Sequence, residues 1–218
     1  VYPGRDESLA PVTDPAILAA IRARYGLSGP YLLYIGTLHP RKNLTRLIHA
    51  FARLLSQLPN SPTPQLPNSL QLVLAGKRGW LYDDILAQVR RLGLEERVIF
   101  TGYVPDPDKP ALLSGASAFV FPSLYEGFGI PVVEAMACGT PVVCSNTSSL
   151  PEVAGDAALL VDPLDVDAIA GAMAHVVSDA DLRRELGQRG LRQARRFSWD
   201  RCARETLAVI ERAAGGID

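Results

Sequence analysis

Ser123-Leu-Tyr-Glu-Gly-Phe-Gly-Ile-Pro-Val-Val-Glu134 is the stretch of this 218-residue chain that decides the predicted fold. The apolar run Ser117–Phe121 precedes it and is typical of a buried strand. Pro131 suits the first turn of a helix, where its missing N–H removes no hydrogen bond, and the helical segment Val132–Cys138 follows. This order predicts a strand, a loop with two glycines and the N-terminus of a helix.

A glycine-bearing loop that runs into a helix favours an anion such as phosphate, because backbone N–H groups and the positive end of the helix dipole meet there. Gly127 and Gly129 let the backbone approach the anion without side-chain obstruction. Glu126 and Glu134 bracket the loop, and since carboxylates repel phosphate, we expect them to accept hydrogen bonds from sugar hydroxyls. A ligand with both a diphosphate and sugar hydroxyls is a nucleotide-sugar.

The spacing of the two glutamates carries little information by itself, because acids at the start of an exposed helix are common. On that alternative, Glu126 and Glu134 only decorate the start of the helix. The flanking residues favour the functional interpretation. The run Glu126-Gly-Phe-Gly-Ile-Pro-Val-Val-Glu134-Ala-Met-Ala-Cys-Gly-Thr-Pro-Val-Val143 resembles the E-x7-E segment of retaining glycosyltransferases of family 4, which have the GT-B fold. The resemblance extends over essentially the whole chain outside residues 59–69.

The composition, with 48% hydrophobic and 21% charged residues, is that of a globular protein. The formal net charge of −1 argues against a nucleic-acid binder, which needs positive charge to neutralise phosphates. No apolar run approaches the ~20 residues that span a bilayer, and no signal peptide is recognised. Cys138, Cys144 and Cys202 lack metal-ligand spacing, as do the three histidines, which predicts free thiols and no metal site. We therefore expect a cytoplasmic protein, with contact to a membrane face left open.

Short apolar runs alternate with amphipathic segments, which predicts an α/β fold. The expected strands are Tyr31–Ile35, Leu70–Ala75, Arg97–Phe100, Ser117–Phe121, Thr140–Cys144 and Ala157–Val161. The expected helices are Asp14–Tyr25, Leu44–Leu58, Trp80–Leu92, Lys109–Ser114, Val132–Cys138, Leu150–Val153, Val166–Val177, Ala180–Arg196 and Trp199–Ala213, with Asp14 and Asp108 as N-caps. Together they predict a Rossmann-like, parallel six-stranded sheet that is flanked by helices and binds ligands across its carboxyl edge. The lack of G-x-G-x-x-G after the first strand disfavours NAD.

Three loops at this edge carry polar residues. Arg41 and Lys42 lie between the first strand and its helix, after the strand-ending Gly36, and either meet a diphosphate or form a plain basic surface loop. Lys77 follows the second strand, and a solvated loop lysine is its equal alternative. The segment Asn146–Ser149 follows the fifth strand, and the sequence assigns it no role.

The resemblance implies transfer from a sugar nucleotide with retention at the anomeric carbon and without a metal. It places Lys42 on the diphosphate, Glu134 on the ribose hydroxyls and Glu126 on the donor sugar, where it helps to position the anomeric centre. Thr37 stands where many members carry an arginine clamp, for which Arg41 could compensate. The implied site has Glu126 as its catalytic residue and binds the nucleotide-sugar through Gly36, Arg41, Lys42, Lys77, Val104, Gly127, Phe128, Gly129, Ile130 and Glu134.

The resemblance also predicts the domain organisation. Residues 1–29 resemble the interdomain linker with a lead-in helix, residues 30–198 the Rossmann-like donor-nucleotide domain, and residues 199–218 the C-terminal helix. Residues 59–69, within a repeated Gln-Leu-Pro-Asn-Ser pattern, are expected to be a flexible insert without function. We expect the C-terminal half of a longer enzyme whose N-terminal domain binds the acceptor. This half alone should then bind nucleoside diphosphate weakly and transfer no sugar.

The donor is only partly indicated. The form Gly129-Ile-Pro-Val-Val-Glu134 is frequent among mannosyltransferases, so GDP-mannose is favoured as the substrate, a glycan or lipid-linked molecule as the acceptor, and no cofactor is expected. A nucleotide-sugar epimerase of the same fold and a stand-alone nucleotide-sugar binding module remain alternatives. The motif fixes neither the base and sugar of the donor nor the acceptor, the linkage or the oligomeric state.

Overall fold

The computed structural model describes residues 1–57, 69–80 and 82–214. In these residues, one sheet of six parallel strands has the order β3-β2-β1-β4-β5-β6. The strands are β1 (Tyr31–Ile35), β2 (Gln71–Ala75), β3 (Val98–Gly102), β4 (Ala118–Phe121), β5 (Val142–Ser145) and β6 (Ala158–Val161). The prediction of a Rossmann-like parallel sheet is confirmed. The predicted insert falls outside the described residues except for Ser69.

The strand order reverses at β1. The chain first builds outward through β2 and β3 and then returns to place β4 on the free side of β1, where Leu32 pairs with Ala118 and Leu33 with Phe119. In open parallel sheets, ligands bind beyond the carboxyl ends of the strands at such a switch point. The loops that follow β1 and β4 therefore lie side by side, although they are far apart in the sequence.

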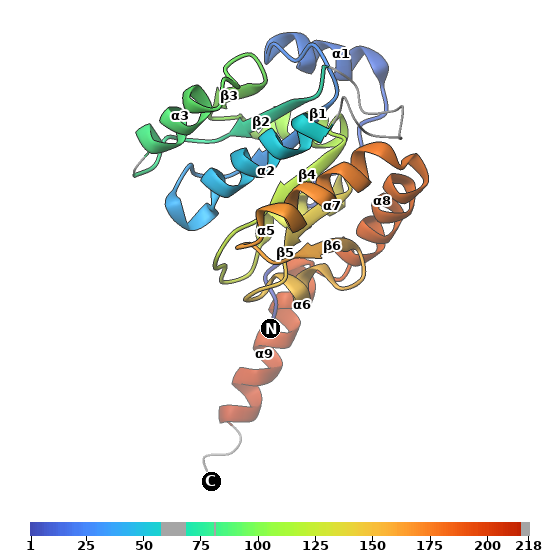
Figure 1. Ribbon diagram of the computed structural model, residues 1–218. Coiled ribbons are helices and arrows are strands. Elements are labelled where there is room, and N and C mark those ends of the chain that lie inside the picture. The colour runs from blue at the N-terminus through green and yellow to red at the C-terminus, as the bar shows by residue number, and fades with distance from the viewer. Residues whose placement is uncertain (58–68, 81, 215–218) are drawn as a thin grey trace.

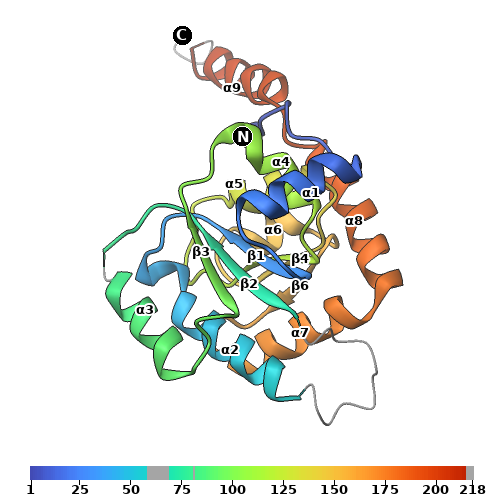
Figure 2. The ribbon, with the colours of Figure 1, turned by 90° about the horizontal axis from the view of Figure 1, so that it is seen from above.

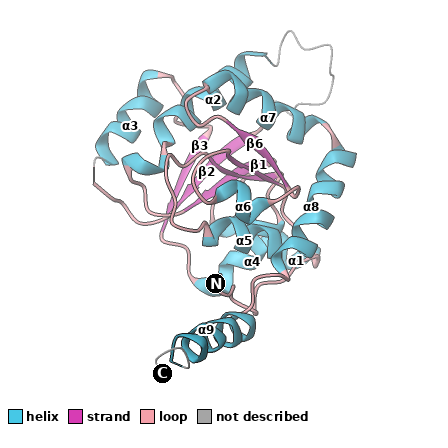
Figure 3. Cartoon of the chain, turned by 90° about the horizontal axis from the view of Figure 1, so that it is seen from below, coloured by secondary structure: helices cyan, strands magenta, loops and turns pink. Residues whose placement is uncertain are grey.

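Helices cover both faces of the sheet. They are α1 (Pro15–Arg24), α2 (Leu44–Gln57), α3 (Tyr82–Arg91), α4 (Lys109–Ser114), α5 (Ile130–Ala137), α6 (Leu150–Ala154), α7 (Val166–Ser178), α8 (Ala180–Ala194) and α9 (Trp199–Ala214). Figures 2 and 3 show α2, α3 and α7 on one face of the sheet and α1, α4 and α5 on the other. Both faces of every central strand are thus shielded from water.

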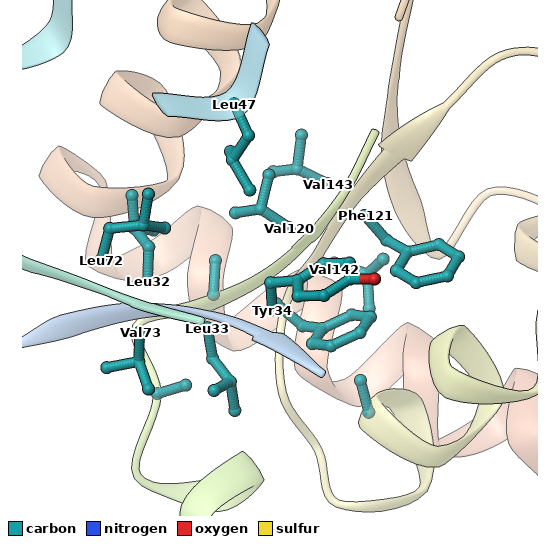
Figure 4. Packing of buried hydrophobic residues seen from close by; sticks show 14 of the residues in the cluster. Leu32, Leu33, Tyr34, Leu47, Leu72, Val73, Val120, Phe121, Val142 and Val143 are labelled. Atoms are coloured by element: carbon teal, nitrogen blue, oxygen red, sulfur yellow. The ribbon is translucent and has the colours of Figure 1, made fainter. Parts of the chain in front are cut away.

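The core explains why the strands read as continuous apolar runs. Figure 4 shows Leu32 and Leu72 on the side of the sheet that faces Leu47 of α2, and Leu33 and Val73 on the opposite side. All five side chains are fully buried. A strand that is buried on both faces cannot alternate between polar and apolar residues, so the runs at β1 and β2 are apolar throughout.

The structure corrects the predicted start of the fifth strand and the predicted N-cap role of Asp108. The fifth strand begins at Val142 instead of Thr140, because Thr140 is tied to other elements: its N–H donates to the Ala135 carbonyl (3.0 Å) and its hydroxyl to the Leu113 carbonyl (2.9 Å). Asp108 does not cap α4 through its side chain. Its carboxylate instead binds the Arg24 guanidinium at 2.7 Å and the Tyr25 hydroxyl, and so holds the end of α1.

Helix α9 projects away from the rest of the molecule (Figure 1). None of its residues is buried, and Trp199, Leu207, Val209 and Ile210 are each about half exposed. In the described ranges, no helix has the length and apolar character needed to cross a membrane.

Candidate functional site

The glycine loop, residues 122–129 after β4, leads into α5 at Gly129. This glycine has φ +110°, and a side chain there would come within 2.6 Å of Leu150. Both observations explain why glycine is needed at the point where the chain enters the helix. Pro131 lies in the first turn of α5, as the sequence predicted. A Cβ atom at Gly127, by contrast, would contact nothing, so this part of the loop borders open space.

The loop presents unused hydrogen-bond donors. Among the hydrogen bonds of the described residues, none is donated by the backbone N–H of Gly127, Phe128, Gly129 or Ile130. Gly127 and Ile130 are exposed, whereas the ring of Phe128 is partly covered by Tyr2 and by Phe197. Free N–H groups at the positive end of a helix favour an anion.

Two cations from the loop after β1 meet Glu126 beside this loop. The Lys42 Nζ atom lies 2.5 Å from Glu126 Oε1, and an Arg41 guanidinium nitrogen lies 3.2 Å from Glu126 Oε2. The Ser123 hydroxyl donates to Oε1 at 2.6 Å. Lys42 and Glu126 are each only 9% exposed. The adjacency of β1 and β4 therefore builds a buried ion pair from residues 84 positions apart.

This cluster sets the ionisation of Glu126. Burial by itself raises the pKa of Glu126, but hydrogen bonds from Lys42 and Ser123 and the charge of Lys42 outweigh it and hold the pKa below its ordinary value. We expected Glu126 to face sugar hydroxyls and did not expect it to pair with Lys42. Because a carboxylate oxygen accepts two hydrogen bonds, Oε2, which meets only Arg41 among the described residues, keeps acceptor capacity for a hydroxyl.

A tight turn places Lys42. The short 3-10 helix Pro40–Lys42 ends at Asn43, whose backbone is left-handed (φ 60°, ψ 30°). The buried Asn43 side-chain amide donates to the carbonyls of Pro122 (3.0 Å) and Pro163 (2.6 Å). These carbonyls follow β4 and β6, so Asn43 fastens the turn across the carboxyl edge of the sheet. Asn43 is not among the site residues predicted from the sequence.

A second part of the site is a cavity of about 260 Å3 beyond the carboxyl ends of β1, β2 and β3. Three predicted residues, Gly36, Lys77 and Val104, line it together. Tyr103 and Lys109 also line it and were not predicted. Lys77 Nζ lies 5.1 Å from the centre of the Tyr103 ring, so a cation and an aromatic ring share one wall.

Glu134 lies apart from the Lys42 cluster, which consists of Arg41, Lys42, Ser123 and Glu126. It lines a hollow of about 560 Å3 between α5, the chain's opening residues and the start of α9. Burial raises the pKa of Glu134, and the negative charge of Asp6 adds to this, whereas the positive charge of Lys109 opposes it. Lys109 therefore connects two places: it lines the cavity near Val104 and acts on Glu134. The structure thus divides the predicted site residues among the Lys42 cluster, the cavity, Glu134 and the loop that leads into α5, which holds Gly127, Phe128 and Gly129 and ends at Ile130.

The loop after β5, to which the sequence assigned no role, touches the glycine loop. The Ser149 hydroxyl shares its one proton between the carbonyls of Phe128 (2.7 Å) and Glu126 (3.0 Å), and the Ser148 hydroxyl accepts the N–H of Glu126. The position of the segment after a strand, at the carboxyl edge, was the one sequence signal that could have pointed to it. In the described part of the chain, no three His, Cys, Asp or Glu side chains are grouped to hold a metal ion.

Known proteins resemble this chain closely. The model of the family described as glycosyl transferases group 1 matches residues 20–193. O-antigen chain mannosyltransferase B of Escherichia coli is 46% identical over 196 residues, 89% of this chain and 49% of that protein. MMP alpha-(1->4)-mannosyltransferase of Mycolicibacterium hassiacum is 37% identical over 178 residues, 80% of this chain and 41% of that protein. The chain therefore spans half or less of the length of these two relatives.

A solved structure agrees with the fold. The C-terminal domain of a group 1 family glycosyl transferase from Francisella tularensis superposes with a TM-score of 0.69 and 22% identity. The superposition covers 85% of this chain and 93% of that one. At this identity the likeness shows the fold alone, which is that of the C-terminal half of a GT-B protein.

Proposed function

The chain belongs to the glycosyl transferases group 1 family, and on that premise we propose that it is the donor-binding half of a retaining glycosyltransferase. The full enzyme moves a hexose from a nucleoside-diphosphate sugar to a glycan or lipid-linked acceptor. One observation carries the proposal: buried Lys42 is fixed against Glu126 beside the loop that runs into α5, where N–H groups have no acceptor among the described residues. A held cation next to such N–H groups favours a diphosphate.

Lys42 and Arg41 supply the charge that the chemistry needs. As the bond between the anomeric carbon and the β-phosphate oxygen breaks, negative charge grows on the departing diphosphate, and held cations and loop N–H groups stabilise it. The acceptor hydroxyl then forms its bond to the anomeric carbon on the same face, which retains the configuration, and its proton passes to the departing diphosphate oxygen. The two cations take the part that a divalent ion takes in other transferases, so we expect no metal requirement.

We assign the other parts of the donor to the remaining residues. The base lies in the cavity around Val104, and the ribose hydroxyls lie at Glu134. Lys109, which lines the cavity and acts on the charge of Glu134, supports the adjacency of these two positions. The donor sugar lies at Glu126, where Oε2 accepts a hydroxyl.

We favour mannose as the sugar and GDP-mannose as the donor. The two relatives named above are both mannosyltransferases, and the form Gly129-Ile-Pro-Val-Val-Glu134 is frequent among enzymes of that specificity. The names of these relatives point to different acceptors, so the acceptor of this chain is left at the level of a glycan or lipid-linked molecule.

An acceptor-binding domain of the same polypeptide is the expected partner. The exposed apolar side chains of α9, such as Trp199 and Ile210, offer a surface to it. Among the described residues of α9, three acidic and three basic side chains balance. An anionic membrane attracts helices with a basic polar face, so the balanced charge favours a protein surface over a lipid one. Transfer by this chain alone is not expected.

Calorimetric titration of the chain with GDP-mannose, UDP-glucose and ADP-glucose tests the proposal. A few charge-assisted hydrogen bonds of ~1.5–3 kcal/mol each and a helix-dipole contribution of ~0.3–2 kcal/mol oppose association costs of ~4–15 kcal/mol. We therefore expect a Kd between about 10 μM and 1 mM for GDP-mannose, and weaker binding of the other two.

Two variants provide the controls. Lys42→Ala should weaken the binding of GDP-mannose at least about tenfold, because it removes a charged partner of the diphosphate. Arg53→Ala removes a cation from an exposed ion pair with Asp167 and should leave the affinity unchanged. Binding of none of the three donors would refute the donor-site assignment, and a preference for UDP-glucose would refute the choice of GDP-mannose.

A further inference from the structure

The hydroxyl of Ser149 is used in an unusual way. Ser149 occupies the N-cap position of α6, where serine ordinarily accepts a hydrogen bond from its own helix, yet its side chain makes no such bond. The hydroxyl is instead 3.0 Å from the Glu126 carbonyl oxygen and 2.7 Å from the Phe128 carbonyl oxygen. A capping hydroxyl stabilises a helix by ~1 kcal/mol. Helix α6 lacks this stabilisation because the Ser149 hydroxyl contacts the glycine loop instead.

Peptide geometry fixes what this contact does. In a trans peptide unit, the C=O and the following N–H lie in one plane and point in opposite directions. The Glu126 carbonyl that faces Ser149 therefore turns the N–H of Gly127 away from Ser149. In the same way, the Phe128 carbonyl turns the N–H of Gly129 away. One hydroxyl, which shares its proton between the two carbonyls, thus contacts two peptide planes whose glycine N–H groups point away from Ser149.

The neighbouring Ser148 completes the arrangement. Its backbone is left-handed (φ 54°), and its hydroxyl accepts the N–H of Glu126 at 3.1 Å. This N–H is therefore consumed by the protein, whereas those of Gly127 and Gly129 have no acceptor among the described residues. The loop after β5 thus engages one N–H and the carbonyls, and it leaves the N–H of exposed Gly127 and that of buried Gly129 without an acceptor among the described residues.

We propose that Ser149 is a positioning residue for the donor diphosphate: by holding the carbonyls of Glu126 and Phe128, it aims the N–H groups of Gly127 and Gly129 at the phosphates. This inference rests on the proposed function, because it needs a diphosphate at the glycine loop. It differs from a purely structural role in one respect. Loss of a positioning residue should weaken only the binding of the phosphates, whereas a loosened loop or fold would also weaken the binding of the nucleoside.

Three variants separate these roles. Ser149→Ala removes the hydroxyl, and Ser149→Thr keeps one. Ser178→Ala is the matched control, because the Ser178 hydroxyl also lies near two carbonyls, those of Ala174 (2.9 Å) and His175 (3.3 Å), in α7 and away from the glycine loop. Each variant and the unaltered chain are titrated by calorimetry with GDP and, separately, with guanosine, which lacks the phosphates. The pairs UDP with uridine and ADP with adenosine cover a different base.

We expect Ser149→Ala to raise the Kd for GDP about 3- to 10-fold, since the loss of one oriented hydrogen bond costs of this order. The Kd for guanosine should stay within about twofold of that of the unaltered chain. Ser149→Thr should bind GDP as the unaltered chain does, and Ser178→Ala should leave the affinity for both GDP and guanosine unchanged. Equal weakening of GDP and guanosine, or unchanged GDP binding by Ser149→Ala, would overturn the positioning role while the proposed function stands. If the unaltered chain binds none of the three nucleoside diphosphates, the proposed function fails and the inference with it.

Discussion

Single side chains set the charge of the candidate donor site. Glu126 and Lys42 are buried together, and each makes the other's charge tolerable in a place that burial alone would disfavour. Glu134 lacks a bonded cation of this kind among the described residues, and burial raises its pKa. The two glutamates that bracket the glycine loop therefore have opposite pKa shifts, and each shift leads to a measurable consequence.

Glu126 should make the fold acid-sensitive. Because its pKa is lowered in the folded chain, its ionised form stabilises the fold above the ordinary glutamate pKa, and this contribution is lost as pH falls through the lowered value. From about pH 5 downward, the free energy of unfolding should fall more steeply in the unaltered chain than in Glu126→Gln. Urea unfolding at a series of pH values measures this, with Glu95→Gln at an exposed position as control. Parallel curves for the unaltered chain and Glu126→Gln would contradict it.

Glu134 should show the reverse. Since its pKa is raised chiefly by burial, the ionised form costs stability above the ordinary glutamate pKa, and this cost diminishes as pH falls. Glu134→Gln should therefore raise the midpoint of urea unfolding at pH 7, with a smaller gain at pH 4. The same variant should weaken GDP about 2- to 10-fold, because an amide oxygen is a poorer acceptor for ribose hydroxyls than a carboxylate. A lower midpoint at pH 7 would contradict the prediction.

Elements decide which of these side chains meet. The strand order at β1 and β4 places the 3-10 turn that carries Lys42 beside the loop that carries Glu126. Asn43 closes that turn in a left-handed conformation and anchors it to the carbonyls of Pro122 and Pro163. The turn is therefore held by one residue through both its backbone and its side chain, and substitutions can separate the two contributions.

Asn43→Gly and Asn43→Ala make that separation. Both lose the side-chain hydrogen bonds, the two donated to carbonyls and the one accepted from Arg46, but only alanine also has an unfavourable left-handed backbone, which costs roughly 1–2 kcal/mol. We expect Asn43→Ala to be less stable than Asn43→Gly by about that amount in chemical unfolding. Gly26→Ala (φ +66°, with open space around the added Cβ) measures the backbone cost alone. Equal stability of the two Asn43 variants would show that the side chain, and not the backbone, holds the turn.

The sequence predicts individual helices and strands better than it predicts which of them lie side by side. The strand Tyr31–Ile35 has the predicted bounds, because a run buried on both faces has an unambiguous pattern. The pairing of Lys42 with Glu126 was not predicted, since it depends on which strand lies beside β1. Ser149 was missed for a related reason: its partners are backbone carbonyls 21 and 23 positions away, and backbone carbonyls leave no mark on the sequence.

At the scale of the molecule, helix α9 projects away from the sheet and its helices, although its first residues border α5 and the chain's opening residues. Its apolar side chains, including Trp199, Leu207 and Ile210, are exposed although the rest of the chain buries an extensive core. An exposed apolar surface of this kind marks an interaction site. We have proposed an acceptor-binding domain of the same polypeptide as the partner, and without that domain the surface has a consequence of its own.

This chain should associate with itself through α9 when studied alone. Sedimentation velocity should show a weight-average mass that rises with concentration, and removal of residues 199–218 should abolish the rise. Leu207→Glu with Ile210→Glu should do the same without shortening the chain, because charges on the apolar stripe oppose its burial. Concentration-dependent association that survives both changes would place the interface elsewhere.

The ring of Phe128 connects the glycine loop to the chain's opening residues and to the segment before α9 through aromatic contacts. Its ring lies 6.0 Å from that of Tyr2 and 5.4 Å from that of Phe197, and Tyr2 and Phe197 lie 5.7 Å apart. Tyr2 is among the chain's opening residues, and Phe197 lies two positions before the start of α9. A displacement of either segment would therefore reach the ring that lies between the two glycines, so this cluster of one tilted and two edge-to-face ring pairs connects the opening residues and the segment before α9 to the glycine loop.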